Sequence, residues 1–322
     1  MSEPTQRRRA ILLMGPTGSG KSELAVRLAE TLPLEIISVD SALVYRGMDI
    51  GTAKPDAAAR SRAVHHLIDI RDPVAGYSAG EFLVDAWSAM QDIWARGRQP
   101  LLVGGTMLYF HALSHGIADL PAADPVVRAA IDAHAARDGW AAVHAELMRV
   151  DPAAAARIHA NDPQRIQRAL EVYRLTGERI SSLQQRRLSV LSDIEVAEIV
   201  LSPLERSELH KRIETRFDTM LQAGFLAEVR ALHERSDLTA EHTSMRAVGY
   251  RQLWRHLAGL STLSEARDQG IAATRQLAKR QLTWLKRRAG ARWFDSMHPH
   301  VARAMADALT EGMFAEPFGV TR

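Results

Sequence analysis

The sequence predicts an α/β protein in which a parallel sheet is flanked by helices and interrupted by an all-helical insertion. The first observation behind this fold class is a glycine-rich motif at residues 15–22 between a strand-like and a helical segment. The second is that strand-like segments alternate with helical patterns early in the chain and return near its end. The third is an Ala-rich, helical stretch between them. We therefore expect a core of residues 1–119 and 191–322, with a helical insertion at 120–190.

Residues 15–22 form the most specific motif of the chain. They match G-x-x-x-x-G-K-[ST] at every required position, as Gly15, Pro16, Thr17, Gly18, Ser19, Gly20, Lys21 and Ser22. An apolar strand candidate at residues 10–14 precedes the motif, and apolar residues at helical spacing follow it from Leu24 to Leu32. This context predicts a P-loop and a P-loop NTPase-like sheet, rather than a glycine-rich turn without a ligand.

The P-loop indicates a site for a polyphosphate or a diphosphate. Its glycines let several backbone N–H groups point inward, and the helix that follows adds the positive end of its dipole. Lys21 supplies a full positive charge, and the Ser22 hydroxyl can ligate a phosphate-bound Mg²⁺. Loops of this kind bind nucleotides such as ATP, but the motif does not by itself identify the ligand.

Two polar residues follow predicted strands. Asp40 ends the apolar segment 34–40, and Thr106 ends the segment 100–106 after two glycines. Ligands bind at the carboxyl ends of parallel strands, so both side chains are expected near the P-loop. On the residues alone, Asp40 is explained equally well as a turn or helix-cap residue, and Thr106 as the N-cap of the next helix.

Between these two strands we expect a loop at residues 45–55 and a helix at residues 79–95. The apolar side of that helix consists of Phe82, Ala86, Ala89, Met90 and Ile93. The adjacent His65 and His66 are not expected to hold a metal ion, because neighbouring residues of a strand face opposite ways.

The insertion is predicted to be helical from Pro121 to Tyr173. Its helices are expected to break at Asp138-Gly139, Asp151-Pro152 and Asp162-Pro163. The helix that starts near Pro163 presents Gln164, Arg165 and Arg168, residue types that can contact nucleobases and phosphates. An ordinary solvated helix face is the alternative, and on the sequence alone it is the more common case.

After the insertion, residues 194–201 are predicted to return to the sheet as a strand. A helix follows over residues 203–235, interrupted near Gly224. Arg212 and Arg216 lie one turn apart on it and could clamp phosphate oxygens. They could also form exposed ion pairs with acidic neighbours on the same helix, Glu208 and Glu214, which is the usual role of such patterns.

The last part of the chain predicts a short helix through Leu257, a long helix at residues 263–288 and a final strand at Arg292–Phe294. Ala278, Leu282 and Leu285 form the apolar stripe of the long helix. Beyond Met297 the signals are weak, and we expect a mobile tail.

Charge and composition narrow the possible classes of function. The formal net charge is only +3, but residues 275–292 contain seven Lys and Arg residues and no Asp or Glu. A local basic block on a nearly neutral chain suggests an anionic polymer as partner. The chain has no cysteine, which excludes disulfides, thiolate zinc sites and cysteine nucleophiles. No apolar run is long enough for a membrane span or a signal peptide, so we expect a cytoplasmic enzyme.

The residues at the ends of the predicted strands indicate which reaction the P-loop ligand undergoes. An ATPase or kinase normally adds a second acidic strand end for Mg²⁺, whereas the segment 100–106 ends in two glycines and a threonine. The bound diphosphate could therefore be a leaving group. A carbon–oxygen bond would then break, and Asp40 would deprotonate the attacking nucleophile. A P-loop kinase of a nucleoside or small metabolite remains the alternative.

Several further segments, in the same order, resemble the bacterial tRNA dimethylallyltransferases, the tRNA isopentenyltransferase family. The resemblance covers nearly the whole chain, from about Ala10 to Asp295. Besides the P-loop, it is carried by ISVDSALVYRGMDIGTAKP at residues 37–55, LVGGTMLYF at 102–110, NDPQR at 161–165, VGYRQ at 248–252 and ATRQLAKRQLTWL at 273–285.

The resemblance implies transfer of a dimethylallyl group from dimethylallyl diphosphate to N6 of the adenosine on the 3′ side of the tRNA anticodon, with Mg²⁺. By this resemblance the P-loop holds the diphosphate, with Ser22 on the metal. Asp40 is implied as the general base, Thr106 as the hydroxyl that helps the bridging oxygen leave, and Arg216 as a cation that neutralises the diphosphate.

The same resemblance implies which residues contact the anticodon stem-loop of tRNA. They are Asp40, Ser41, Ala42, Leu43, Thr106, Arg128, Gln164, Arg165, Ile166, Gln167, Arg168, Arg246, Ala247, Val248, Gly249, Tyr250, Arg251, Lys279, Arg280, Gln281, Leu282, Thr283, Trp284, Leu285 and Lys286. We expect a monomer, with no zinc and no membrane partner. Two further alternatives are a relative that prenylates free adenine nucleotides and a non-catalytic RNA-binding protein.

Overall fold

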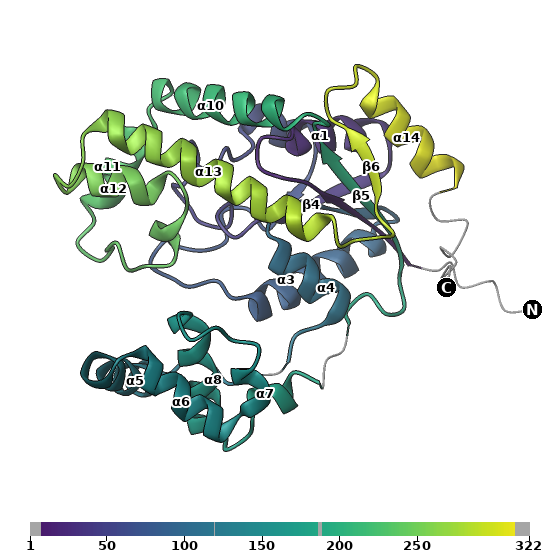
Figure 1. Ribbon diagram of the computed structural model, residues 1–322. Helices are drawn as coiled ribbons and strands as arrows, with labels where there is room; N and C mark the ends of the chain where they lie inside the picture. The colour runs from purple at the N-terminus through teal and green to yellow at the C-terminus, as the bar shows by residue number, and fades with distance from the viewer. Residues whose placement is uncertain (1–7, 119, 186–188, 313–322) are drawn as a thin grey trace, which may run out of the picture. The chain divides into compact units, whose positions relative to one another are not determined.

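The computed structural model describes residues 8–118, 120–185 and 189–312 (Figure 1). The chain divides into two compact units. One comprises residues 1–113 and 191–322, and the other comprises residues 114–190. Each unit has a hydrophobic core of its own, described below.

The larger unit is built on a sheet of six parallel strands. They are β1 (Arg9–Met14), β2 (Leu34–Val39), β3 (His65–His66), β4 (Gln99–Gly104), β5 (Glu195–Ser202) and β6 (Arg292–Asp295). Their order in the sheet is β3-β2-β4-β1-β5-β6. The predicted parallel, P-loop NTPase-like sheet is confirmed.

The strand register places the three predicted site segments at one edge of the sheet. Met14, the last residue of β1, pairs with Gly104 of β4, and Gly104 also pairs with Val39, the last residue of β2. The carboxyl ends of β1, β2 and β4 are therefore side by side. The P-loop, Asp40 and Thr106 each begin within two residues of these ends.

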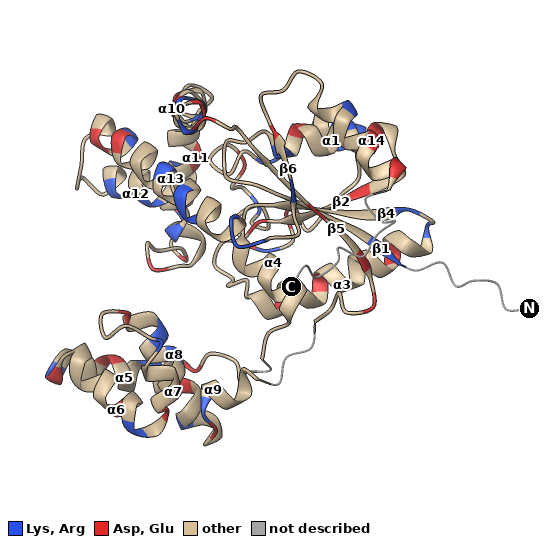
Figure 2. Ribbon diagram, turned by 45° about the vertical axis from the view of Figure 1, so that its right-hand side comes forward, with Lys and Arg blue, Asp and Glu red and all other residues tan. Residues whose placement is uncertain are grey.

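Helices cover both faces of the sheet. In the larger unit they are α1 (Lys21–Thr31), α2 (Ala57–Arg62), α3 (Ala79–Ala95), α4 (Met107–His115), α10 (Arg206–Gln222), α11 (Phe225–His233), α12 (Tyr250–Leu257), α13 (Leu263–Leu285) and α14 (Val301–Glu311), with a 3₁₀ turn at Ser244–Arg246. Figure 2 shows α1 and α14 on one face of the sheet and α3 on the other. Burial on both sides explains why the strands read as continuous apolar runs rather than alternating ones.

Helix α3 forms over the predicted range. Its N-terminus carries a capping box, in which Ser78 Oγ accepts a hydrogen bond from Glu81 N at 3.2 Å and Glu81 Oε2 accepts one from Ser78 N at 2.8 Å. The five residues of the predicted apolar side are all buried. The other predicted helices and strands also form, with the break between α10 and α11 at Gly224, where φ is +102°.

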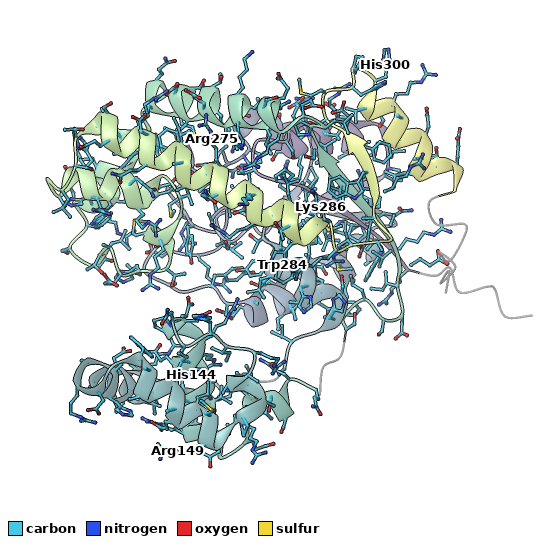
Figure 3. The ribbon with its side chains drawn as sticks, in the orientation of Figure 1. His144, Arg149, Arg275, Trp284, Lys286 and His300 are labelled. Atoms are coloured by element: carbon cyan, nitrogen blue, oxygen red, sulfur yellow. The ribbon has the colours of Figure 1, made fainter. Side chains whose placement is uncertain are left out.

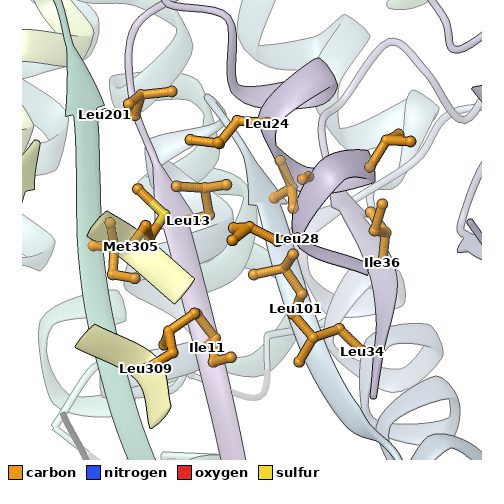
Figure 4. Close-up of a cluster of buried hydrophobic side chains, with 14 of the residues drawn as sticks. Ile11, Leu13, Leu24, Leu28, Leu34, Ile36, Leu101, Leu201, Met305 and Leu309 are labelled. Carbon is orange, nitrogen blue, oxygen red and sulfur yellow. The ribbon is translucent and has the colours of Figure 1, made fainter. Parts of the chain in front are cut away.

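The expectation of a mobile tail beyond Met297 is wrong for residues 301–311. These form α14, whose Met305 and Leu309 are buried in the main core, which also contains Ile11 and Leu13 of β1 and Leu28 of α1 (Figure 4). The apolar stripe of α14 is short and separated by alanines and charged residues, so it gave a weak signal. Its burial depends on contacts with elements near the start of the chain, including α1, which begins 280 residues earlier. The rest of the tail, residues 313–322, lies outside the described residues.

The smaller unit is helical throughout its described residues. It contains α5 (Pro125–Asp138), α6 (Trp140–Val150), α7 (Pro152–Ala155), α8 (Pro163–Thr176) and α9 (Ile180–Leu183). Asp124, Asp151 and Asp162 each cap a helix whose first residue is proline, an arrangement that proline's fixed φ favours. The predicted breaks are confirmed. A separate core, which includes Ile131 and Leu170, holds these helices together.

None of the helices in the described ranges is both long enough and apolar enough to cross a membrane.

Candidate active site

The P-loop wraps around the start of α1. Gly18 and Gly20 have φ of +82° and +90°, which favours glycine at both positions. No side chain caps α1, so its first N–H groups remain available to a ligand. Gly15 has no room for a side chain, because a Cβ atom would lie 2.2 Å from the carbonyl oxygen of Leu201. The loop therefore has the shape that an anion-binding turn requires.

Lys21 is the buried cation of this loop. Its Nζ donates hydrogen bonds to Pro16 O at 2.7 Å and to Ser19 Oγ at 3.3 Å, which folds the side chain back over the loop. Burial, and secondarily the charge of Arg216, lowers the pKa of Lys21 to about 7, while Asp40 acts in the opposite direction. In the free site, Lys21 is therefore only partly protonated at neutral pH.

Arg216 adds a second cation to the same site. Burial lowers its pKa, the nearby Asp40 raises it, and Arg212 lowers it further. Within the described residues Arg216 has no hydrogen bond or ion pair, and Glu214 pairs instead with Arg267 and Arg275. The ion-pair alternative with Glu208 and Glu214 is therefore not what the structure shows. Two cations and one carboxylate leave the site with excess positive charge, which an anion of several charges would neutralise.

Asp40 shapes the turn after β2 and also faces the site. Its Oδ1 accepts hydrogen bonds from Ala42 N at 2.8 Å and Leu43 N at 3.4 Å. Its second carboxylate oxygen has no hydrogen-bond partner in the described ranges, and the residue lines two cavities. Asp40 therefore stabilises the turn with one carboxylate oxygen, and its other oxygen is available to accept a proton or a hydrogen bond from a ligand.

Thr106 is linked to the same turn. Its Oγ1 accepts a hydrogen bond from Ser41 N at 3.1 Å, and its backbone N–H donates to Val39 O at 3.2 Å. Its carbonyl, rather than its hydroxyl, accepts the first bonds of α4, from Tyr109 N at 2.9 Å. The N-cap explanation therefore does not account for the hydroxyl, which is held beside the turn that carries Asp40.

Two adjoining cavities occupy this edge of the sheet. We call the first, of about 280 Å³, the phosphate cavity, because Lys21 and Ser22 line it. We call the second, of about 540 Å³, the large cavity, because it is the larger of these two. A third cavity, of about 620 Å³, is lined by residues of α10 and shares Gly18 and Arg216 with both. The phosphate cavity and the large cavity share seven lining residues, namely Thr17, Gly18, Asp40, Thr52, Gly105, Arg216 and Gln281. The junction of the two cavities is therefore where a carboxylate, a cation and a buried amide meet.

The large cavity has an apolar floor and a polar rim. The floor includes Ile213, Phe217 and Met220 of α10, Phe225 of α11 and Leu277 of α13. The rim includes residues 246–248, Arg280 and Trp284. A hydrocarbon group and an aromatic base could both be accommodated here, next to a diphosphate.

Some lining residues were not predicted from the sequence. Gly51 and Thr52 come from the 45–55 loop, which was predicted only as a loop. Phe217 and Met220 lie on the same face of α10 as Ile213 and Arg216, at helical spacing. An apolar helical stripe that contains one arginine is a signal that could have identified this wall.

The basic helix α13 presents a mixed set of predicted residues. Lys279, Arg280, Thr283, Trp284 and Lys286 are exposed, whereas Gln281 and Leu285 are buried and Leu282 packs on the Leu209–Ile213 cluster. Figure 3 shows Arg275, Trp284 and Lys286 along this helix. Arg275 and Arg288 form ion pairs with Glu214 and Glu198. The exposed cations, and not the whole block, are therefore available to a polymer.

The segment at residues 246–251 borders the large cavity. Arg246, Ala247, Val248 and Tyr250 line it, while Gly249 and Arg251 do not. Tyr250 is buried, and its hydroxyl donates to Glu228 Oε1 at 2.5 Å. Arg246 is 58% exposed and can reach a ligand from the rim.

The predicted residues of the insertion belong to the smaller unit. Arg128 of α5 pairs with the fully buried Glu171 of α8 at 2.8 Å and so connects the two helices, while Arg168, one turn before Glu171 on α8, pairs with it at 2.5 Å. Ile166 is buried in the core of this unit, and Gln167 donates to Asp132 at 2.6 Å. Gln164 and Arg165 are exposed and have the most accessible polar groups of this set.

Comparisons with known proteins agree on one family. The family model described as IPP transferase matches residues 43–288. A tRNA dimethylallyltransferase of Stenotrophomonas maltophilia (strain K279a) is 57% identical over 297 residues, which cover 91% of this chain and 93% of the relative. A crystal structure of the tRNA isopentenylpyrophosphate transferase of Bacillus halodurans aligns with a TM-score of 0.69 and 36% identity over 95% of this chain and 97% of the other.

A eukaryotic dimethylallyltransferase crystallised while acting on tRNA aligns with a TM-score of 0.79 and 25% identity, over 94% of this chain and 79% of the other. Similarity of this extent covers both the sheet that carries the P-loop and the insertion.

Proposed function

The chain belongs to the IPP transferase family and is a prenyltransferase that acts on tRNA, and we propose that it takes the prenyl group from dimethylallyl diphosphate. The acceptor is N6 of the adenosine on the 3′ side of the anticodon, and diphosphate is released. The observation that carries this proposal is the junction of the two cavities. A cationic phosphate site and an apolar chamber meet there beside Asp40 and Arg216.

The donor fits this division of the site. Its diphosphate would lie in the phosphate cavity, near Lys21, Arg216 and the free N–H groups at the start of α1. Its five-carbon group would extend toward the apolar floor formed by Phe217 and Met220. The carbon–oxygen bond between these two parts then lies near the junction.

We assign the bond changes as follows. The N6 nitrogen of adenine attacks C1 of the dimethylallyl group, the C1–O bond breaks, and its electron pair leaves with the diphosphate. Lys21 and Arg216 stabilise the charge that develops on the diphosphate. Thr106 donates its hydroxyl proton as a hydrogen bond to the bridging oxygen. The free oxygen of Asp40 takes the proton that N6 loses, so atoms and charge balance.

The acceptor adenine must leave the stack of the anticodon loop to enter the large cavity. Exposed cations of α13, including Arg280 and Lys286, would hold the RNA backbone beside the opening. Arg246 at the rim would add a further contact. In the insertion, Gln164 and Arg165 have exposed side chains suited to contacts with the stem-loop.

Mg²⁺ fits the residues present. Ser22 lines the phosphate cavity, and its hydroxyl has no hydrogen-bond partner in the described part of the chain. Protein sites for Mg²⁺ commonly supply one or two oxygen atoms and leave the rest to phosphates and water. We propose that Ser22 ligates the ion, which when bound would neutralise charge on the diphosphate. We also propose that the protein acts as a cytoplasmic monomer.

The experiment that tests this function combines purified protein, Mg²⁺, labelled dimethylallyl diphosphate and unmodified tRNA, with ATP omitted. Label in the RNA, recovered on adenosine after nuclease digestion, supports the proposal. Absence of label together with phosphate release from added ATP would instead support the alternative, a P-loop kinase of a nucleoside or small metabolite.

A further inference from the structure

Gln281 is a buried polar residue of helix α13, which also buries the apolar Ala278 and Leu285 one turn before and after it. The residue is 7% exposed, whereas its neighbour Arg280 is exposed. Both polar atoms of its amide are used. Oε1 accepts a hydrogen bond from Thr17 N at 2.9 Å, and Nε2 donates one to Gly105 O at 2.8 Å. One side chain thus joins α13, the P-loop and the segment that carries Thr106.

The orientation of this amide is determined by its partners. Thr17 offers only a backbone donor and Gly105 only a carbonyl acceptor at these contacts, so the oxygen must face the P-loop and the nitrogen must face Gly105. The fit at Gly105 is close. A Cβ atom on that residue would lie 2.5 Å from Gln281 Nε2, so a glycine is required for this approach.

Gln281 also lies at the point where the two cavities meet, since it lines both of them. The two segments that it connects hold opposite sides of the proposed reaction. The P-loop would hold the diphosphate, and Thr106 follows directly after Gly105. The separation between these segments decides whether the Thr106 hydroxyl meets the bridging oxygen.

We propose that Gln281 is a positioning residue for the transfer reaction, which sets the P-loop and the Thr106 segment at their working separation, and that it is not a contact for tRNA. This proposal depends on the proposed roles of the P-loop and Thr106. It differs from the role that the family resemblance implies for the segment 279–286. It also means that the Thr17 N–H is already bonded, so the diphosphate is held by the later N–H groups of the loop.

The test compares three single variants on α13 with the unchanged protein. Gln281→Met keeps the size of the side chain and removes both hydrogen bonds. Arg280→Ala removes the adjacent exposed cation. Gln276→Met makes the same chemical change as the first variant at an exposed position of the same helix. Each is measured for the Kd of tRNA, the KM of dimethylallyl diphosphate, kcat and the midpoint of thermal unfolding.

For Gln281→Met we expect kcat/KM for the diphosphate substrate to fall roughly ten- to thirtyfold, from the loss of two hydrogen bonds, while the Kd of tRNA stays within about twofold. Arg280→Ala should show the reverse pattern, and Gln276→Met should resemble the unchanged protein. Gln281→Glu keeps an acceptor for Thr17 N but replaces the donor to Gly105 O by a second carboxylate oxygen, which repels that carbonyl. It should therefore also lose activity, with the Kd of tRNA unchanged.

An increase in the Kd of tRNA for Gln281→Met, with unchanged kinetics for the diphosphate, would overturn the proposal and support an RNA contact. Equal loss in all readouts for both Gln281 variants, together with a lower unfolding midpoint, would overturn it in favour of a purely structural role. The unchanged protein is assayed first, so a failure of the transfer reaction itself is recognised separately.

Discussion

Lys21 has a pKa near neutrality in the free protein because it is buried beside Arg216. A bound diphosphate adds negative charge next to it and raises that pKa. At pH values between the pKa of free Lys21 and its pKa in the proposed complex, binding would take up a proton. We therefore expect the affinity for the diphosphate to fall as pH rises above about 7. Well below pH 7, Lys21 is already protonated in the free protein, so binding there takes up no proton at this residue.

We predict an uptake of roughly one proton per bound diphosphate at pH 8, where the ligand is already ionised. Titration calorimetry in two buffers with different ionisation enthalpies measures this number. Lys21→Met removes the titrating group and should remove the uptake along with most of the affinity. An uptake that persists in this variant would assign the proton to another group.

Asp40 uses one carboxylate oxygen in the turn after β2, and the base that we propose is its other oxygen. Asp40→Asn retains an oxygen that can accept from Ala42 N and Leu43 N, but it removes the base. We predict that this variant still binds tRNA and loses transfer by about a hundredfold or more. Filter binding and a single-turnover assay measure the two quantities. Transfer at an unchanged rate would disprove the role of general base.

At the scale of elements, Glu228 of α11 secures the loop that supplies Gly51 and Thr52 to the large cavity. Its carboxylate accepts hydrogen bonds from three successive backbone N–H groups, Asp49 at 2.8 Å, Ile50 at 2.7 Å and Gly51 at 3.1 Å, and from the Tyr250 hydroxyl. The loop is also held by Lys54, whose buried ammonium contacts two carboxylates.

We predict that Glu228→Ala lowers the free energy of unfolding by about 3 kcal/mol, because it leaves these donors without their acceptor. Denaturant titration measures the change. Glu234→Ala, at an exposed position just after the same helix, is the control and should stay within about 0.5 kcal/mol of the unchanged protein. A Glu228→Ala protein as stable as that control would contradict the anchoring role.

The exposed cations of α13 and of the turn that follows it, which contains Arg287, should govern the salt dependence of RNA binding. Replacing Arg280 and Arg287 together by alanine should weaken tRNA binding and reduce the slope of log K against log salt by roughly 1.5, the value for two lost phosphate contacts. Binding measured from low to moderate salt gives the slope. Arg303→Ala on α14, at a position 85% exposed, provides the matched control. Equal slopes in all three proteins would place the RNA elsewhere.

At the scale of the whole molecule, the two ends of the chain share one core. Met305 of α14 is fully buried with residues of α1 and β1, so the end of the chain stabilises the helix that carries the P-loop. We predict that Met305→Ala lowers the free energy of unfolding by about 2–4 kcal/mol through loss of burial and a residual cavity. Ala304→Gly, a change on the exposed side of the same helix, should cost about 1 kcal/mol. Calorimetric unfolding of both variants is the measurement. A loss for Met305→Ala no larger than that for Ala304→Gly would contradict the packing of Met305 in the core.

The sequence by itself determined the local and the strongly patterned features of this protein. The P-loop motif, the strand-like runs on either side of the insertion and the Asp-Pro helix starts each depend on neighbouring residues, and each was predicted where it forms. Asp40 and Thr106 were placed near the P-loop by one topological rule, that parallel strands end at a common edge.

Only the tertiary structure decided which atoms of these residues are free and which are bound. Gln281 and Arg280 are adjacent in a basic segment, yet one is buried against the P-loop and the other is exposed. Arg128 pairs with Glu171 of another helix, and α14 packs in the same core as the distant α1. Each outcome depends on contacts between residues tens to hundreds of positions apart, whose energy is not encoded in local periodicity.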